Sequence, residues 1–479
     1  MSESNVTITA NAKVITYNIA YNLDDGQTTE DNPVSYDVTS ATITLKNPTK
    51  TGYTFVGWSG TGLTGNTNTT VSIARGSTGD REYTANWSIN SYNLTINKTT
   101  GINTVTGDGL HEYNSSITAS CTMLAGYEFD KWTGDFTTET FAMPANNATM
   151  TANAKPIVYN ITYSGIDGAT FATANPTSYD ITSATITLNN PTKANHLFVG
   201  WTEGTATFPV RLGQITNGST EDKTFTAHFL EILTFNLSGG VPLVMHKCPA
   251  GSFMMGSPDD ELGHQSNETY HKVTLTNDFY IGKFEVTQEQ YYAVMESNPS
   301  NFTGDNSRPV EQVSYDDLTK ANGFLAILNA SFSSQLPDGY HFALPTEAQW
   351  EYACRAGTGT SLNNGTNITQ KTGICDNLDK VGWYDKNSGN TTKPVGQKLP
   401  NAWGLYDMHG NVYEWCRDGF ADYTSQEENP IGVNSNDNYV NRGGSGENPA
   451  SNCRSAFRNY QWKRVAVGFI GFRVALVKD

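Results

Sequence analysis

The sequence of 479 residues has few charged residues, few cysteines and no long apolar run. Only 16% of its residues are charged, and the acidic ones outnumber the basic ones, which gives a formal net charge of −17 at pH 7. Because nucleic-acid binding needs basic groups that neutralise phosphates, this balance disfavours a nucleic-acid partner. No apolar stretch of about 18 residues is present, so no membrane span is expected, and no basic-then-apolar leader opens the chain.

The few cysteines and histidines also exclude classes of site. The six cysteines are too sparse for a disulfide framework and have no CxxC or CxxH spacing for zinc. They stand at Cys121, Cys248, Cys354, Cys375, Cys416 and Cys453. The eight histidines are scattered along the chain. A zinc domain is therefore not expected, and the cysteines do not indicate a cellular compartment.

The first half of the chain is a repeat array. The segment Tyr17–Tyr21 recurs as Tyr159–Tyr163, and Phe55–Trp58 recurs as Phe198–Trp201. A third, divergent copy lies between them and carries Trp132 at the matching position. Self-similarity at a fixed period indicates an array of small units. The predicted domains are 1–13 (the end of a preceding repeat), 14–89, 90–155 and 156–231 (three repeats) and 232–479.

Each repeat is predicted to be mostly β-structure. Thr, Ile, Leu and Val alternate over residues 41–45 and 185–188, which is the period of a half-buried strand, and Asn-Pro turns follow at Asn47 and Asn190. The segments Gly52–Trp58 and Tyr83–Trp87 resemble internalin-type B repeats, which are small β-grasp modules of bacterial surface proteins. The resemblance implies a stalk or an adhesive unit. The alternative is a plain spacer without a ligand.

The first residues copy the end of the divergent repeat. Residues Asn5–Lys13 match Asn147–Lys155, which form the last expected strand of that repeat. We therefore expect that the full protein carries an earlier repeat and an export signal upstream of Met1.

The second half carries several motifs in a specific order. They are Pro249–Gly256, Glu285–Gln288, Leu344–Tyr352, Trp403–Cys416, Asn441–Ser445, Asn452–Ala456 and Ile470–Val474. These motifs resemble the formylglycine-generating-enzyme-like (sulfatase-modifying-factor) domain, a member of the C-type-lectin-like fold. The resemblance covers residues 237–479.

Capping chemistry predicts three helices in this domain. Thr287, Ser314 and Thr346 each precede an acid or amide by three residues, which is the pattern of a capping box. The helices are predicted over 288–296, 315–329 and 347–356, with Gly357 after the last one. Residues 358–398 are expected to form long loops. The predicted fold is therefore multidomain: tandem small β-rich repeats followed by an α+β C-type-lectin-like domain.

Because formylglycine-generating enzymes are oxidases, the resemblance allows the sequence to be checked for their copper ligands. Family members that make formylglycine hold copper between two cysteines; the downstream one corresponds to Cys453 and the upstream one to Asn448. One thiolate cannot replace a two-thiolate Cu(I) site. No copper is expected, and the sequence predicts no catalytic residue.

The resemblance also implies a structural calcium ion. In the family it is held by positions that correspond to the Asp407 side chain, the Gly410 and Val412 carbonyl groups and the Glu414 carboxylate. Calcium accepts such mixed oxygen ligands. The alternative is that Asp407, Gly410 and Asn411 form a tight turn and that Glu414 pairs with an arginine.

The last residues resemble the variable proteins of diversity-generating retroelements, in which a lectin-like frame carries diversified surface positions. The frame segments are present, and the predicted ligand-binding positions between them are Gly446, Glu447, Pro449, Phe457, Tyr460, Gln461, Trp462, Lys463, Val465, Val467 and Phe469. We expect them to share one exposed face, with Phe457 and Trp462 as anchors. The alternative is that these side chains belong to a local core.

The predicted function is a non-enzymatic binding protein, displayed outside the cell or on the surface of a bacterium, that recognises a protein or glycan on another cell or surface. One alternative is a formylglycine-generating-type oxidase or a related enzyme. Another is that the head is structural and the repeats are adhesive.

Overall fold

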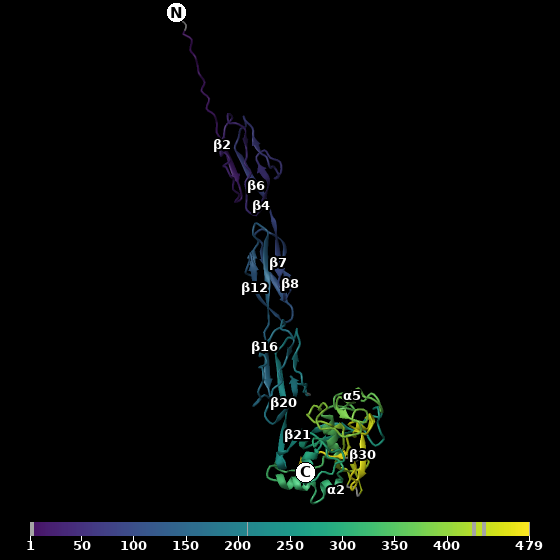
Figure 1. Ribbon diagram of the computed structural model, residues 1–479. Coiled ribbons are helices and arrows are strands. Elements are labelled where there is room, and N and C mark those ends of the chain that lie inside the picture. Colours follow the sequence, from purple (N-terminus) through teal and green to yellow (C-terminus); the bar gives the residue numbers. More distant parts are fainter. Residues whose placement is uncertain (1–3, 208, 424–427, 434–436, 479) are drawn as a thin grey trace. The chain divides into compact units, whose positions relative to one another are not determined.

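A computed structural model describes residues 4–207, 209–423, 428–433 and 437–478. The chain forms two compact units. The first contains residues 1–160, 178–186 and 215–222, and the second contains residues 161–177, 187–214 and 223–479. Strands make up the repeats, and every α-helix of the described residues lies in the C-terminal domain (Figure 1). The predicted fold class is confirmed.

The first repeat is a four-stranded sheet in the order β2-β1-β6-β4, in which β1 and β6 are parallel. Its strands are β1 (Tyr17–Asn22), β2 (Ser35–Tyr36), β3 (Ile43–Thr44), β4 (Tyr53–Gly60), β5 (Ser72–Ile73) and β6 (Arg81–Ile89). Trp58 is fully buried in its core, and its indole Nε1 donates to Asn47 Oδ1 over 3.0 Å. The core tryptophan and the predicted Asn-Pro turn are therefore joined by a hydrogen bond.

The second repeat has the same arrangement, with the order β12-β14-β7-β9 and a parallel β14–β7 pair. Its strands are β7 (Ser91–Lys98), β8 (Ile102–Thr106), β9 (Gly109–Glu112), β10 (Ser116–Thr118), β11 (Ser120–Met123), β12 (Tyr127–Gly134), β13 (Thr140–Ala142) and β14 (Ala148–Pro156). Trp132 lies in its core at the position of Trp58. The divergent sequence therefore keeps the fold of the first repeat.

The third repeat ends in a strand that continues into the C-terminal domain. Its strands are β15 (Tyr159–Ser164), β16 (Ser178–Tyr179), β17 (Ile186–Thr187), β18 (His196–Glu203), β19 (Gln214–Ile215) and β20 (Lys223–Asn236). β20 pairs with β15 and β18 through its first part and with β21 (Pro242–Cys248) through its last part. The boundary predicted between residues 231 and 232 falls inside this strand.

The helices of the C-terminal domain begin where capping chemistry predicted. They are α1 (Gln288–Met295), α2 (Tyr315–Thr319), α3 (Phe324–Phe332), α4 (Glu347–Arg355) and α5 (Asp376–Asp379). Thr287, Ser314 and Thr346 all form complete capping boxes. The single helix predicted over 315–329 is wrong, because α2 and α3 are separate. A Cβ at Gly323 would lie 2.6 Å from the Asp317 carbonyl oxygen, so glycine allows α3 to begin against the end of α2.

Two antiparallel-rich sheets hold the core of this domain. One continues from β20 in the order β21-β24-β32-β25, and the other has the order β30-β29-β28-β31. Their further strands and the remaining elements are β22 (Gly251–Met255), β23 (His271–Leu275), β24 (Phe279–Gly282), β25 (Tyr340–Ala343), β26 (Gly382–Trp383), β27 (His409–Gly410), β28 (Tyr413–Gly419), β29 (Asn438–Arg442), β30 (Arg458–Trp462), β31 (Ile470–Gly471), β32 (Ala475–Lys478) and the 3-10 turns η1 (Ser238–Gly240) and η2 (Ala450–Cys453). Trp350 and Trp415 are fully buried in two adjoining hydrophobic clusters.

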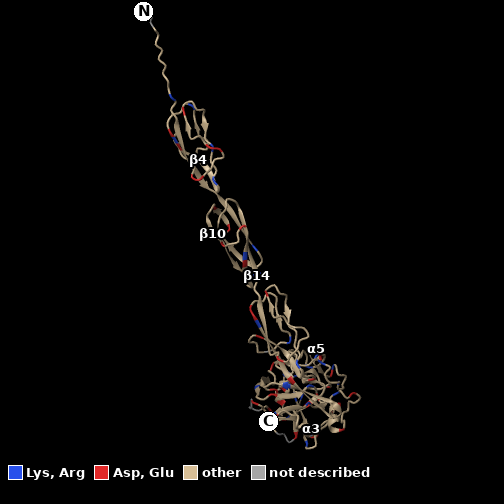
Figure 2. Cartoon of the chain, turned by 90° about the vertical axis from the view of Figure 1, so that its left-hand side faces the viewer, with Lys and Arg blue, Asp and Glu red and all other residues tan. Residues whose placement is uncertain are grey.

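Charged residues are sparse along the repeats, which are mostly tan in Figure 2. Among the helices of the described part of the chain, none has the length and apolar character needed to cross a membrane.

Candidate ligand-binding site

The predicted ligand-binding positions lie in the turn before η2, directly before β30 at Phe457, on β30 and in the loop after it. Four of the eleven are exposed and four are half-buried. The exposed ones are Glu447, Tyr460, Trp462 and Val467, and the half-buried ones are Pro449, Gln461, Lys463 and Val465. These eight positions are accessible for contact with a partner.

The other three positions are buried, which contradicts a single exposed face. Phe457 is only 5% exposed and packs in the main core, and its carbonyl oxygen accepts a hydrogen bond from Arg442. Phe469 is 7% exposed and packs against Phe302 with ring centroids 4.7 Å apart. Gly446 is buried beside Phe469. For these three positions the alternative, a local core, is the one that the structure shows, and Phe457 is not a surface anchor.

Tyr460 and Trp462 share one face of β30 because side chains two residues apart on a strand point the same way. They are 47% and 63% exposed. Gln461, between them, projects to the opposite face. The predicted positions on β30 therefore divide between two faces, and the aromatic pair is on one of them.

An aromatic row that the sequence analysis missed supports this pair. The Tyr460 ring lies 4.4 Å from the Phe420 ring between centroids, and the Arg458 guanidinium lies 5.1 Å from Phe420 and 3.9 Å from Tyr423. Phe420 and Tyr423 follow β28, in a part of the sequence without a recognisable motif. Phe420 could have been noticed because it directly follows Asp418-Gly419, where the chain leaves a buried strand and reaches the surface.

The loop after Trp462 is held at both ends. Asp316 N donates to the Lys463 carbonyl oxygen over 3.0 Å, and Gln312 N donates to the Val467 carbonyl oxygen over 3.2 Å. Tyr413 N donates to the Phe469 carbonyl oxygen over 2.8 Å. Side chains on this loop can therefore change while the main chain keeps its anchors.

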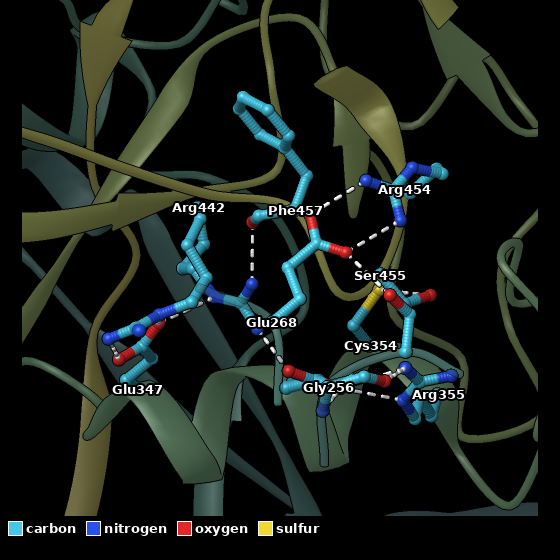
Figure 3. A network of polar contacts seen from close by, with 12 residues as sticks. Gly256, Glu268, Glu347, Cys354, Arg355, Arg442, Arg454, Ser455 and Phe457 are labelled. Carbon is cyan, nitrogen blue, oxygen red and sulfur yellow. Dashed lines mark hydrogen bonds and ion pairs between the residues drawn. The ribbon is translucent and has the colours of Figure 1, made fainter. Parts of the chain in front are cut away.

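Buried ion pairs hold the frame beneath the site (Figure 3). Arg454 is fully buried, and its guanidinium binds both carboxylate oxygens of Glu268 over 2.7 and 2.9 Å and Glu261 over 2.7 Å. Arg442 pairs with Glu351 and Glu347, and Arg458 binds Glu347 over 2.6 and 2.8 Å. The frame segments around Gly443–Ser445, Cys453–Ser455 and Gly471–Arg473 are buried, as predicted.

The two positions that correspond to the copper ligands carry no thiol pair. Cys453 is fully buried, and burial raises the pKa of its thiol far above the usual value. Asn448 is held by Ser445, whose hydroxyl donates to Asn448 Oδ1 over 2.6 Å. All six cysteines are unpaired. Within the described ranges, no group of three or more His, Cys, Asp or Glu side chains is arranged to hold a metal ion.

The residues predicted to bind calcium adopt the alternative arrangement. Both carboxylate oxygens of Glu414 accept from Arg473 over 2.6 Å, and Oε2 also accepts from Trp350 Nε1 over 2.7 Å. Asp407, Gly410 and Asn411 have left-handed backbone conformations, as a tight turn requires. Glu414 is thus paired with an arginine, as in the alternative arrangement, and calcium binding by the four residues stays a prediction.

Two further carboxylates, those of Asp407 and Glu285, lie near this pair. Asp407 Oδ2 accepts from Gly396 N over 2.6 Å, while its Oδ1 is buried and unpartnered. Burial raises the pKa of Asp407 to about 6. Glu285 accepts from Asn411 Nδ2 over 2.7 Å, and burial together with the nearby Asp407 and Glu414 raises its pKa well above the usual value. Arg473 therefore binds Glu414 and also acts electrostatically on Asp407 and Glu285.

Stability is expected to fall between about pH 4 and pH 7 because of Asp418. Burial and the nearby Glu347 raise the pKa of Asp418 to about 7 from an ordinary value of 3.8. The folded state then holds a proton that the unfolded state has released, so stability decreases as pH rises through this window. Each pKa unit corresponds to about 1.4 kcal/mol, which gives a loss on the order of 4 kcal/mol above pH 7.

The test is Asp418→Asn, with melting temperatures measured from pH 4 to pH 8. Asp418 accepts from Glu347 N over 2.8 Å and from Gly432 N over 2.6 Å, and asparagine keeps one of these two acceptors. We expect the variant to have a flatter pH profile than the parent protein. Parallel profiles would show that Asp418 is ionised in the folded state throughout.

Comparisons with known proteins identify a domain family for each half of the chain. Residues 244–478 match the sulfatase-modifying factor enzyme 1-like domain, residues 17–86 and 159–228 match the Listeria-Bacteroides repeat domain, and residues 92–157 match the divergent InlB B-repeat domain. Among solved structures, Treponema denticola variable protein 1 is 30% identical; the match covers 51% of this chain and 98% of that protein, with a TM-score of 0.43.

Two curated relatives carry other names. The chaperone protein LppX of Paenibacillus barcinonensis is 35% identical over 193 residues, which cover 32% of this chain and 66% of LppX. The formylglycine-generating enzyme of Mus musculus is 28% identical, and the match covers 50% of this chain and 77% of the mouse enzyme. The C-terminal half of the chain is therefore a sulfatase-modifying factor enzyme 1-like domain, and Listeria-Bacteroides and divergent InlB B-repeat domains precede it.

Proposed function

We propose that this protein is a non-enzymatic binding protein of the bacterial surface, and that its C-terminal domain recognises a protein or glycan through the face of Tyr460 and Trp462. The observation that carries the proposal is this pair of exposed aromatic side chains on a strand whose frame is held by buried ion pairs. Exposed aromatic residues on a rigid support commonly dominate binding energy. B repeats are typical of surface proteins, which supports display outside the cell.

The charges beside the pair support a role in association. The Arg464 side chain is 82% exposed and lies 3.5 Å from Asp316, and Lys463 is half-buried next to it. Such charges influence the association rate and its dependence on salt more than the affinity. The half-buried Val465 and the exposed Val467 extend the contact surface along the loop.

The second candidate function is an oxidase of the formylglycine-generating type, which the named relatives favour. Titration of the reduced protein with Cu(I) separates the two functions. Tight, stoichiometric binding that Cys453→Ser abolishes would support the oxidase. Weak binding that is unchanged in the variant fits the buried thiol of Cys453 and the asparagine at position 448.

The binding proposal is tested with the double variant Tyr460→Ser/Trp462→Ser. The full chain and the variant are compared on arrays of glycans and of recombinant surface proteins. Removal of a central aromatic anchor commonly costs about 2 kcal/mol, so capture of an array partner should weaken by about 30-fold or more. The melting temperature should stay nearly unchanged, because both side chains are exposed.

Tyr292→Ser is the matched control, because Tyr292 is 59% exposed on α1 and is not among the predicted ligand-binding positions. It should leave capture unchanged. Undiminished capture by the double variant would place recognition elsewhere, for example in the repeats.

A further inference from the structure

The segment before the first repeat exposes a row of apolar side chains. Residues 4–16 form no strand and are exposed throughout. Val6 is 83% exposed and Ile8 is 89% exposed, and polar residues alternate with them. Such alternation is the pattern of a strand with one apolar face, and in this segment that face has no core to pack on.

The same sequence forms a core strand elsewhere in the chain. Residues Asn5–Lys13 match Asn147–Lys155 of β14, the closing strand of the second repeat. In β14 the positions of Val6, Ile8 and Ala10 are Ala148, Met150 and Ala152, which are 3%, 0% and 0% exposed. β14 lies between a parallel partner, β7, and an antiparallel partner, β12. The exposed side chains therefore occupy positions that face the core in a complete repeat.

Two asparagines of the segment have matching roles in β14. Asn147 Oδ1 accepts from Asn93 N over 2.8 Å at the start of the strand. Asn153 Nδ2 donates to the Lys131 carbonyl oxygen over 3.1 Å and to Thr133 Oγ1 over 2.9 Å, which fastens β14 to β12. The segment carries Asn5 and Asn11 at these positions, and both are exposed. It thus has the polar groups of a closing strand as well as the apolar ones.

The first repeat also has an exposed residue, Val38, at a position that contacts the preceding repeat in the other two repeats. Val38, Tyr113 and Ile181 occupy equivalent positions in the three repeats. In each repeat the first tyrosine pairs with a residue of the neighbouring strand, and the equivalent position lies two residues after that partner. Tyr113 packs on Gly52 of the first repeat, and Ile181 packs on Gly126 of the second, with 2.5 Å from Ile181 Cδ1 to the place of a Cβ. Glycine is needed in both turns because a side chain would occupy this space. Val38, at the same position, is 41% exposed.

The spacing of these features is the same in both places. Three residues lie between Lys155 and Tyr159, and three lie between Lys13 and Tyr17. A module closed by residues 5–13 would therefore meet the first repeat as the second repeat meets the third, with its glycine turn on Val38.

We propose that residues 5–13 and Val38 form a docking site for a further B-repeat module that lacks its own closing strand and takes residues 5–13 as that strand. Such a module has two strands, equivalent to β7 and β12, with no strand between them. It has a tryptophan core against which Val6, Ile8 and Ala10 pack, and a glycine turn that contacts Val38. This interaction is independent of the ligand-binding face proposed above.

The probe is a copy of residues 90–146 fused directly before Asn5 of the otherwise intact chain. This copy is the second repeat without β14, so residues 5–13 follow it where β14 would. Hydrogen exchange of residues 6–12 and of the turn around Val38 is compared with the unfused chain. We expect the amides of residues 6–12 to exchange about 100-fold more slowly in the fusion, because they join a sheet.

Three variants sharpen the test. Val6→Ala/Ile8→Met gives the segment the side chains of β14 and should be protected at least as well. Ile8→Asp places a charge in the core and should remove the protection from the fusion while leaving the unfused chain unchanged. Val38→Asp should remove only the protection of the turn around Val38. Amides of residues 6–12 that stay unprotected in the fusion, or protection that survives Ile8→Asp, would overturn the proposal.

Discussion

Replacing Arg473 by methionine is expected to unfold the C-terminal domain, or to leave it barely stable, at neutral pH. Arg473 is fully buried and donates two hydrogen bonds to Glu414 and one each to the carbonyl oxygens of Gly282 and Tyr406. Its loss leaves the Glu414 charge buried beside Glu285 and Asp407. Breaking a buried pair from one side costs about 3–5 kcal/mol, which is a large share of the stability of a domain.

Thermal unfolding followed by near-ultraviolet circular dichroism measures this effect. Arg464→Met is the control, because its side chain is 82% exposed and its ion pair with Asp316 should contribute at most about 1 kcal/mol. The double variant Arg473→Met/Glu414→Met removes both charges and should recover part of the lost stability. A single variant that melts within about 1 kcal/mol of the parent would show that the three carboxylates are not charged in the folded state.

Calcium binding at Asp407, Gly410, Val412 and Glu414 stays a prediction, and chelation tests it. An ion that binds only the folded state raises the melting temperature by mass action. A parent protein whose melting temperature falls with chelator and recovers with added calcium would show that an ion binds in spite of the arginine pair. An unchanged melting temperature agrees with neutralisation by Arg473 alone.

Local sequence chemistry was enough to predict the helix starts and the repeat cores. A capping box is a contact between residues three positions apart, so Thr287, Ser314 and Thr346 could be recognised without any tertiary information. The three repeats could be aligned through Trp58, Trp132 and Trp201, all of which are buried. The break between α2 and α3 was missed because it depends on how closely Gly323 approaches the preceding helix.

The candidate site was predicted only in part, because burial on β30 depends on long-range contacts. Alternation along the strand suggests that Tyr460 and Trp462 share a face. It does not show that this face is exposed to solvent, or that Phe420 packs against Tyr460. Phe457 lies one residue before β30 and was assigned to the surface, whereas it packs in the main core. Pairing of Glu414 with an arginine was one of two predicted alternatives, but the sequence could not show that this arginine is Arg473, 59 residues away.

Trp58→Ala is expected to unfold the first repeat while the C-terminal domain melts as in the parent. Trp58 is fully buried, and its ring lies 6.0 Å from Tyr21, 5.6 Å from Phe55 and 6.4 Å from Tyr83 between centroids. Truncating a buried tryptophan costs about 3–5 kcal/mol. A module of about 70 residues has little stability beyond this amount, because a small domain buries a small core.

Hydrogen exchange locates the effect of Trp58→Ala within the chain. Amides of β1, β4 and β6 should lose their protection, whereas those of β28 and β29 should keep it, since the repeats and the C-terminal domain have separate cores. The second repeat should be weakened less than the first, because it keeps its own core and loses only contacts with the first repeat, such as those of Tyr113 with Gly52 and Tyr53. Trp462→Ala is the matched control: that side chain is 63% exposed, so its removal should change stability by less than about 0.5 kcal/mol. Unchanged protection of β6 in Trp58→Ala would show that the other core residues of the first repeat suffice without the tryptophan.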